Sequence, residues 1–206
     1  MKSMLVIGIG RFGRHLALKL TELGNEVLVI DRDEEAVNKL APLVTSAQIG
    51  DCMEPEVTRS LGVDNFDCCF VCISEDFQSS LEITSMLKEM GAPFVVSKAD
   101  RDIHAKFLLK VGADEIIYPE RDMAQRAAMR YSAKNAYDYI ELAPDYALME
   151  MQAPDSWAGK SVLDVDVRNR FGVNIIGVKI AGKVEPVTDA RRVFLQGEHL
   201  LVAGAK

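Results

Sequence analysis

Residues 4–13 read MLVIGIGRFG, an apolar run that leads directly into a glycine-rich loop. The run has the length of a buried strand, and the loop follows the pattern G-x-G-x-x-G, with glycines at Gly8, Gly10 and Gly13. In this pattern the first glycine permits a tight turn, the second lets a pyrophosphate approach the backbone, and the third lets the following helix pack on the sheet. The helix would then present its free N–H groups and its positive dipole end to the anion. The stretch therefore predicts a nucleotide-binding loop.

The sequence beyond the loop alternates short apolar runs with stretches of helical spacing. The apolar runs are, in order, 4–8, 26–31, 46–50, 68–74, 94–98 and 115–118. Glycines follow the helical stretches and favour helix ends at Gly24, Gly62, Gly91 and Gly112. Strands that alternate with helices imply right-handed crossovers and a parallel sheet, and six strands is the size of a dinucleotide-binding fold. The sequence thus predicts an α/β fold with a Rossmann-type, doubly wound parallel sheet.

The pattern changes after the sixth run. Residues 120–135 keep helical spacing and predict a connecting helix, after which short strands predominate. These later strands are expected at 139–142, 146–151, 174–179 and 199–202. One helix is expected at 162–170, ended by Gly172. We place the domain boundary near residue 137, which gives a nucleotide-binding domain at 1–137 and a small α+β domain at 138–206.

Composition narrows the functional classes. The 206 residues carry a formal net charge of −7, with 49% hydrophobic and 27% charged residues, which is ordinary for a globular protein. An acidic chain is a poor partner for nucleic acid, because phosphate backbones bind to basic faces. No uncharged apolar run approaches the roughly 18 residues that span a bilayer, and the start of the chain lacks a signal-peptide pattern. We therefore expect a cytoplasmic protein that does not bind nucleic acid.

Three of the four cysteines, Cys68, Cys69 and Cys72, lie in one apolar run. Because side chains alternate along a strand, Cys68 and Cys72 should face one side of the sheet and Cys69 the other. This arrangement argues against a redox or zinc pair, which needs a turn or a helix start. Buried thiols in a reducing compartment are the expected state.

Two charged residues indicate which nucleotide the loop would hold. Asp31 ends the second strand, near the offset of about 20 residues at which a carboxylate binds ribose hydroxyls. This carboxylate would repel a 2′-phosphate and so disfavours NADP, although the neighbouring Arg32 could still accommodate one. Arg11 lies in the loop itself, where a guanidinium suits the terminal phosphates of ADP or ATP better than the bridging pyrophosphate of NAD.

Further polar residues follow the other strands, at the edge where open α/β sheets bind ligands. They are Asp51, Ser74, Lys98 and Glu120. Lys98 could neutralise a phosphate, and Glu120 could ligate a divalent cation that bridges phosphate oxygens. A catalytic apparatus is not evident: no tyrosine has the Tyr-x-x-x-Lys spacing, and His15, His104 and His199 have no evident acidic partner in a loop. We therefore expect a binding protein and not an enzyme.

At this point the sequence resembles a known family. The segments that carry the resemblance are 4–13, Asp31, IGD at 49–51, Lys98-Ala99, Gly112-Ala113-Asp114 and YPERDMA at 118–124. They are similar to the regulators of Trk and Ktr potassium transporters, the RCK proteins (regulators of potassium conductance). The tail is similar to the small C-terminal domain of that family through 162–165, Arg168, Gly172 and 175–178. The resemblance extends over nearly the whole chain.

The resemblance implies a regulator that dimerises through its nucleotide domain and assembles into a ring of eight domains beneath a membrane channel. ATP and ADP would favour different ring shapes, and the protein would lie at the inner face of the membrane through its channel partner. The implied nucleotide ligands are Gly8, Gly10, Arg11, Phe12, Gly13, Asp31, Arg32, Asp51, Cys52, Ser74, Lys98 and Glu120, with Glu120 also a cation ligand. Cyclic di-AMP is a second expected ligand, at Arg168, Asn174 and Ile175 of the C-terminal domain. The apolar stripe of Ile103, Phe107, Leu108 and Val111 fits a dimer surface or a core equally well.

Three alternatives remain open at this stage. A small NAD-dependent oxidoreductase would share the glycine loop but needs an acid–base residue. An NAD(H)-sensing regulator is compatible with Asp31, and Arg11 favours ATP or ADP over it. A redox repressor that binds nucleic acid is disfavoured by the net charge and by the absence of a helix-turn-helix segment.

Overall fold

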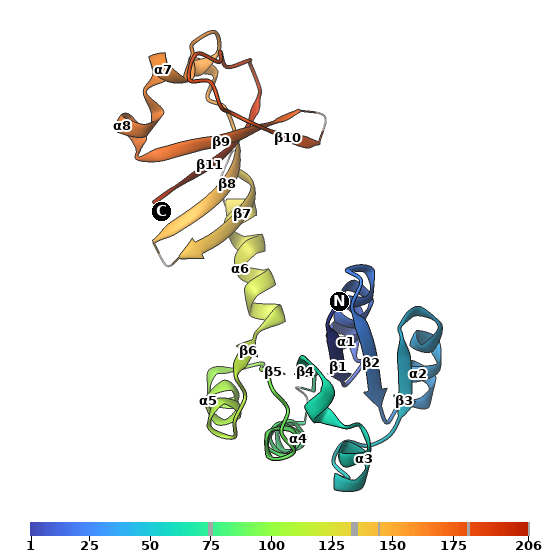
Figure 1. The fold of residues 1–206 in the computed structure, drawn as a ribbon. Helices are drawn as coiled ribbons and strands as arrows, with labels where there is room; N and C mark the ends of the chain where they lie inside the picture. Colours follow the sequence, from blue (N-terminus) through green and yellow to red (C-terminus); the bar gives the residue numbers. More distant parts are fainter. Residues whose placement is uncertain (74–75, 133–135, 144, 181, 206) are drawn as a thin grey trace. The chain divides into compact units, whose positions relative to one another are not determined.

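The computed structural model describes residues 1–73, 76–132, 136–143, 145–180 and 182–205. The chain forms two compact units, Met1–Arg121 and Asp122–Lys206, which are described separately below (Figure 1). Along the chain, the boundary between the units falls within helix α6 (Pro119–Ser132), whereas the sequence placed it after this helix, near residue 137. Ser74, one of the expected ligands, lies outside the described residues.

The N-terminal unit is built on a six-stranded parallel sheet with the order β3-β2-β1-β4-β5-β6. The strands are β1 (Ser3–Ile7), β2 (Glu26–Asp31), β3 (Ser46–Ile49), β4 (Cys68–Val71), β5 (Val95–Lys98) and β6 (Glu115–Ile117). The helices are α1 (Arg11–Glu22), α2 (Glu34–Leu40), α3 (Pro55–Ser60), α4 (Phe77–Glu89) and α5 (Asp102–Lys110), with 3-10 turns η1 (Ala41–Leu43) and η2 (Val63–Asn65). The order reverses between β1 and β4, which confirms the predicted Rossmann-type fold.

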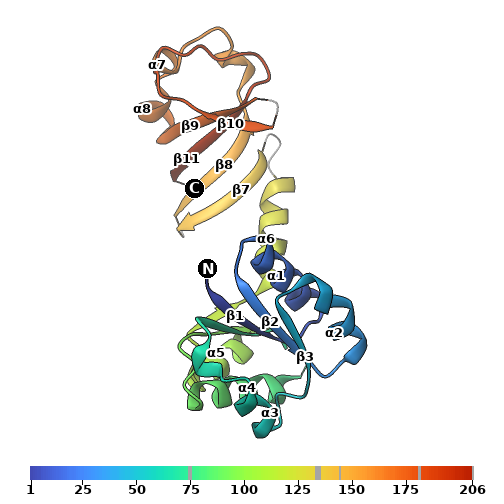
Figure 2. The ribbon, with the colours of Figure 1, turned by 45° about the vertical axis from the view of Figure 1, so that its right-hand side comes forward.

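Both faces of the sheet are buried at its central strands, which explains why strands such as β1 are continuous apolar runs. Along β1, Leu5 and Ile7 pack with residues of α4, whereas Met4 and Val6 pack with residues of α1 and α2. Figure 2 shows the helices on the two sides of the sheet. At the switch in strand order, the carboxyl ends of β1 and β4 lie side by side, and a helix starts after each strand. Ligand sites of open α/β sheets form in this arrangement.

The cysteines lie as the strand alternation predicts. Cys69 packs in the cluster on the α4 side, whereas Cys68 and Cys72 pack in the cluster on the α1 side. All four cysteines are free. Burial raises the pKa of Cys52, Cys69 and Cys72 to about 12 and that of Cys68 to about 11, so these thiols remain protonated at neutral pH.

The C-terminal unit is a five-stranded antiparallel sheet with the order β10-β9-β11-β8-β7, covered on one face by short helices. Its strands are β7 (Ala136–Ala143), β8 (Tyr146–Gln152), β9 (Val173–Ile180), β10 (Lys183–Pro186) and β11 (His199–Ala205). Its helical segments are η3 (Asp155–Trp157), α7 (Val162–Val165) and α8 (Val167–Phe171). The small α+β domain is thus confirmed. The sequence missed β10, because this edge strand is exposed at every position and shows no apolar alternation.

The single helix expected at 162–170 is wrong. Asp166 adopts a left-handed conformation with φ of 52° and separates α7 from α8. In a continuous helix Val165 and Val167 would point about 200° apart, whereas both are buried in one cluster with Val178 and Phe194. The break lets the two valines enter the same core, and aspartate is among the residues that tolerate this conformation best.

Two buried carboxylates give the C-terminal unit a pH-dependent stability. Glu198 forms a paired contact with the guanidinium of Arg192, and these hydrogen bonds hold the pKa of Glu198 below its usual range. Burial alone would raise the pKa of Glu150, but hydrogen bonds from His199 and Lys179 hold it below its usual range. A depressed native pKa stabilises the fold above the unfolded value and loses this effect as the pH falls through the native value.

We therefore expect the melting temperature of the C-terminal unit to be steady from pH 7 to pH 5 and to fall below about pH 4.3, the ordinary pKa of glutamate. Trp157, the only tryptophan, packs against the core of this unit and reports its unfolding by fluorescence. Replacing both Glu150 and Glu198 with glutamine should flatten the acid dependence. Asp145→Asn, which changes an exposed carboxylate of the same unit, should leave the acid dependence as in the wild type. An unchanged slope in the double variant would contradict the assignment.

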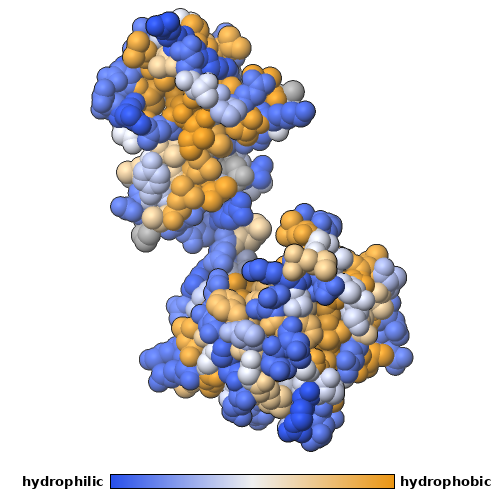
Figure 3. Space-filling model, viewed as in Figure 1, coloured by the Kyte–Doolittle hydropathy of each residue, from blue (hydrophilic) through white to orange (hydrophobic). Residues whose placement is uncertain are grey.

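Large apolar side chains stay exposed on both units (Figure 3). On α5, Ile103 and Phe107 are 50% and 41% exposed, whereas Leu108 is fully buried. The apolar stripe of this helix therefore belongs partly to the surface and partly to the core. Within the described segments, the longest apolar stretches of helix are too short or too polar to cross a bilayer.

Candidate functional site

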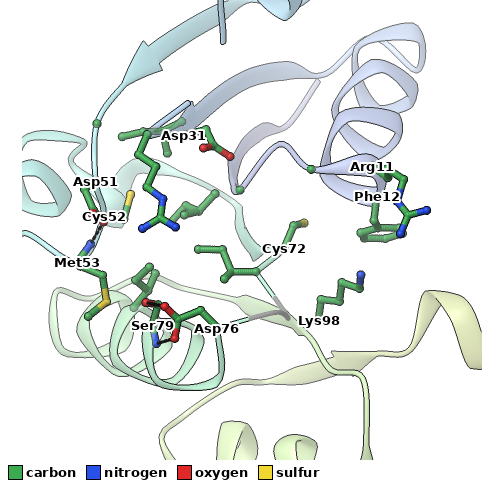
Figure 4. Close-up of a pocket in the computed structure, with 18 of the residues that line it drawn as sticks. Arg11, Phe12, Asp31, Asp51, Cys52, Met53, Cys72, Asp76, Ser79 and Lys98 are labelled. Carbon is green, nitrogen blue, oxygen red and sulfur yellow. Dashed lines mark hydrogen bonds between the residues drawn. The ribbon is translucent and has the colours of Figure 1, made fainter. Parts of the chain in front are cut away.

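A pocket opens at the carboxyl ends of the central strands, at the switch in strand order (Figure 4). Its volume of about 290 Å³ is close to the lower end of the roughly 300–1,000 Å³ typical of ligand pockets. Most of the residues that the sequence singled out line it together: Gly8, Gly10, Arg11, Phe12, Asp31, Arg32, Asp51, Cys52, Lys98 and Glu120. These ten residues come from five separate segments of the chain, which the fold gathers around one cavity.

The three loop glycines have three different roles. Gly8 turns the chain with φ of +87°, and a Cβ there would lie 2.8 Å from Cγ1 of Ile73. A Cβ on Gly13 would lie 2.0 Å from the carbonyl oxygen of Gly8, so Gly13 permits α1 to pack against the loop and does not itself line the pocket. A Cβ on Gly10 would meet nothing within 4 Å. Gly10 thus leaves open space at the pocket wall, where a bound group can approach the backbone.

The start of α1 fits an anion. Gly10 is the N-cap of this helix, no side chain caps it, and its first turn contains no acidic residue. The N–H groups of the first turn are therefore left without a capping side chain, at the positive end of the helix dipole. Because Gly10, Arg11 and Phe12 all line the pocket, this helix end faces the cavity. The residues present fit a phosphate group.

Asp31 is hydrogen-bonded to the glycine loop. Its Oδ2 accepts a hydrogen bond from the Ile9 N–H at 2.7 Å, and its Oδ1 accepts one from the Asp33 N–H at 2.9 Å. Each carboxylate oxygen keeps further acceptor capacity, so ribose hydroxyls could still donate to it. Asp31 therefore shapes the loop as well as lining the pocket, which the sequence did not indicate.

The pocket has two chemically different ends. Arg11 and Lys98 lie at one end, and Asp51 and Met53 lie at the other (Figure 4). At the cationic end, Lys98 Nζ donates a hydrogen bond to Glu120 Oε1 at 2.8 Å. This hydrogen bond, supported by the charges of Lys98 and Arg11, holds the pKa of Glu120 below its usual range. Outer phosphates would be attracted to this end, and a nucleoside would extend toward the other.

The structure gives Glu120 a role that the sequence did not foresee, as the partner of Lys98. Within the described part of the chain, no group of three or more histidine, cysteine or acidic residues is placed to hold a metal ion. A cation near Glu120 would thus take most of its ligands from phosphate oxygens and water.

Other pocket residues were missed by the sequence analysis, notably Asp76 and Ser79. Asp76 is the N-cap of α4: its Oδ1 accepts from the Ser79 N–H at 3.0 Å and its Oδ2 from the Ser79 hydroxyl at 2.6 Å. These hydrogen bonds hold the pKa of Asp76 below its usual range. The sequence contains a signal for Asp76, since an aspartate directly before a helical stretch is typical of an N-cap.

The prediction that no histidine has an acidic partner in a loop was wrong for His104, whereas the acidic partner of His199 lies on a strand. His104 is fully buried, with Nδ1 3.2 Å from Asp100 Oδ1 and Nε2 2.6 Å from Ser80 Oγ. His199 contacts Glu150 at 2.9 Å. Serine, histidine and aspartate in this order resemble a hydrolytic triad, but Ser80 and His104 are fully buried and neither lines the pocket. This arrangement ties α4 to α5 and does not expose a nucleophile.

The second expected ligand site lies in the C-terminal unit. Arg168, on α8, donates from Nε to Asn174 Oδ1 on β9 at 2.8 Å, so these two residues are neighbours. Ile175 is half-buried against the core of the unit. The three residues thus lie around the turn between α8 and β9, with part of the hydrogen-bonding capacity of Arg168 already in use.

Comparison with known proteins places the chain among potassium uptake proteins. The TrkA-N domain family matches residues 4–119. The chain is 41% identical to Ktr system potassium uptake protein C of Bacillus subtilis (strain 168), covering 99% of this chain and 92% of that protein. It is 36% identical to Ktr system potassium uptake protein A of the same organism, covering 100% and 92%. The corresponding protein A of Vibrio alginolyticus is 31% identical, covering 98% and 92%.

The fold also matches solved structures over the full chain. The RCK domain of GsuK superposes with a TM-score of 0.70 at 18% identity, covering 100% of this chain and 45% of that one. The GsuK channel bound to NAD superposes with a TM-score of 0.71 at 18% identity, covering 100% and 37%. The chain therefore covers less than half the length of these solved chains. At 18% identity, the structural similarity is evidence for the fold. With the family match over residues 4–119 and the Ktr proteins similar from end to end, the chain belongs to the TrkA-N family, together with the Ktr system potassium uptake proteins.

Proposed function

We propose that this protein is the nucleotide-sensing regulatory subunit of a Trk/Ktr-type potassium uptake system, gating a membrane channel subunit according to the bound nucleotide. The observation that carries the proposal is the pocket, which combines an uncapped helix start, a ribose-type carboxylate and three cations, Arg11, Arg32 and Lys98. The full-length similarity to Ktr potassium uptake proteins supports the transport system. A regulatory role without catalysis fits a pocket whose two cysteines are buried and protonated.

Within this proposal the nucleotide is ATP or ADP. Arg11 and Lys98 supply positive charge at one end of the pocket, where a chain of terminal phosphates carries its charge. A divalent cation with ATP would use Glu120. NAD(H) is the alternative ligand, since the fold is shared with a channel solved with NAD. Asp31, whose partly buried carboxylate lies beside Ile9, disfavours NADP, because a 2′-phosphate would approach an anion.

Calorimetric titration with ATP, ADP, AMP, NAD, NADH and NADP tests the proposal. We expect ATP and ADP to bind with one site per chain and NADP not to compete. NADP that binds more tightly than ATP would overturn the nucleotide assignment. NADH that binds more tightly than both ATP and ADP would favour the NAD(H)-sensing alternative, and turnover of a hydride donor would establish an oxidoreductase.

The assembly and partners follow the same proposal. The protein would form dimers that assemble into a ring of eight, at the inner face of the membrane through its channel partner. The exposed Ile103 and Phe107 on α5 offer apolar surface for such association. Cyclic di-AMP would bind the C-terminal unit at Arg168, Asn174 and Ile175. This second binding should survive a bulky residue at Gly10 and be lost with Arg168→Ala.

Arg11→Ala should weaken ATP binding far more than AMP binding. Removing a charged hydrogen-bond partner costs about 1.5–3 kcal/mol, so we expect a loss of about 10- to 100-fold for ATP and little change for AMP. The matched control is Arg14→Ala, an exposed arginine of the same helix that does not line the pocket. Titration of the three proteins with both nucleotides provides the comparison. Equal losses for ATP and AMP would refute the assignment of Arg11 to the outer phosphates.

A further inference from the structure

The ion pair between Lys98 and Glu120 joins the pocket to the first turn of α6. Lys98 ends β5 with its side chain only 11% exposed, and Glu120 is the second residue of α6 with its side chain 67% exposed. A nearly buried ammonium needs a counter-charge, and Glu120 supplies it at 2.8 Å. The pair therefore holds the start of α6 against the pocket wall.

A second contact fixes the same turn on its other side. Arg121 Nη1 donates to Asp102 Oδ1 at 2.7 Å, and its guanidinium lies 3.4 Å from the ring centroid of Tyr118. Asp102 also accepts a hydrogen bond from the Tyr118 hydroxyl at 3.2 Å. The compact N-terminal unit ends at Arg121, and the chain continues through α6 into the C-terminal unit. The anchored turn is thus the point at which the chain leaves the nucleotide pocket.

An outer phosphate and Glu120 would compete for Lys98. Both are anions, and the repulsion between them is strongest where the site is shielded from water. Arg11, which also lies near Glu120, would be drawn toward the phosphate at the same time. A nucleotide with one phosphate places less negative charge at this end of the pocket and would disturb the pair less.

We propose that the Lys98–Glu120 ion pair is a latch on α6, which the outer phosphates of a bound nucleotide open. This inference rests on the proposed nucleotide site and adds to it the route by which the pocket acts on the connection between the units. Release of Glu120 removes one of the two side-chain contacts that hold the first turn of α6, so the turn frays more readily.

Amide hydrogen exchange of the α6 segment, measured on the full chain in EDTA with ATP or AMP, tests the latch. EDTA removes the separate effect of a cation on Glu120. With ATP we expect exchange in the first half of α6 to be faster by about twofold to fivefold, the scale of losing a partly exposed ion pair. AMP should leave it unchanged. Glu120→Gln should show the faster exchange without nucleotide, and ATP should add nothing further.

The same variant makes a prediction for binding. In EDTA, Glu120→Gln should bind ATP about twofold to fivefold more tightly, because the competing anion is gone. Asp122→Asn, which changes the charge in the same turn away from the pocket, should behave like the wild type in both measurements. If ATP binds to the wild type but α6 exchange does not change, or if Glu120→Gln weakens ATP binding, the latch is wrong and the nucleotide site stands. If ATP does not bind to the wild type, the proposed function fails as well.

Discussion

Gly13→Ala is expected to destabilise the N-terminal unit by about 3 kcal/mol or more, the upper range of overpacking effects. The added Cβ would lie 2.0 Å from the carbonyl oxygen of Gly8 and 3.1 Å from the Cβ of Cys72. The first of these neighbours is backbone in the tight turn of the loop, and the second is part of the buried core, so neither can move cheaply. Relief would require α1 to shift away from β1 and β4. Denaturant unfolding followed by circular dichroism, with exchange of β1 amides, measures the loss.

Gly10→Ala is the matched control, three residues earlier in the same loop. Its backbone conformation suits any residue, and its Cβ would meet nothing within 4 Å. Alanine is a poorer N-cap than glycine, which costs about 1 kcal/mol or less. Its Cβ would enter the space beside the pocket wall, so we expect a folded protein that binds ATP at least about tenfold more weakly, as a blocked close approach requires. A Gly13→Ala protein as stable as the wild type, or a Gly10→Ala protein that binds ATP normally, would contradict these roles.

The part of the fold that the sequence predicts best is the part in which local chemistry leaves little choice. The run at 4–7 has to be a strand buried on two faces, and Gly8 and Gly13 are placed where any side chain would collide. Asp31 follows at a fixed offset because one helix and one strand separate it from the loop. Each of these constraints acts between residues that are close in the sequence. They can therefore be identified from the sequence alone.

The contacts that the sequence did not reveal depend on distant segments. His104 finds Asp100 one turn away and Ser80 on another helix, and only the packing of α4 on α5 brings the latter near. Lys98 and Glu120 were both singled out, but their pairing depends on the parallel alignment of β5 with β6, which brings the start of α6 beside Lys98. Asp166 adopts its left-handed conformation because Val165 and Val167 both pack in the same core, although the residues around it have helical spacing.

Asp31→Ala should weaken ATP binding about 5- to 150-fold, corresponding to about 1–3 kcal/mol for a lost charged hydrogen-bond partner. Two effects contribute. The carboxylate would no longer accept from the ribose hydroxyls, and the Ile9 N–H would lose its acceptor at 2.7 Å, so the glycine loop would be held less well. Asparagine is not an adequate substitute, because its amide NH₂ would face the N–H of either Ile9 or Asp33, both of which are donors.

Titration of both proteins with ATP and with 2′,3′-dideoxy-ATP separates the two effects as a double-mutant cycle. If Asp31 binds the ribose, the wild type should prefer ATP over the dideoxy nucleotide by about tenfold or more, and Asp31→Ala should lose most of this preference. The dideoxy nucleotide has no ribose hydroxyls for Asp31 to bind. Its loss of affinity from the wild type to Asp31→Ala therefore measures the contribution of the loop through Ile9. A preference for ATP that persists undiminished in the variant would show that Asp31 acts on the loop alone. The ribose would then be bound by another residue of the pocket, such as Asp51 or Asp76, whose carboxylates also line it.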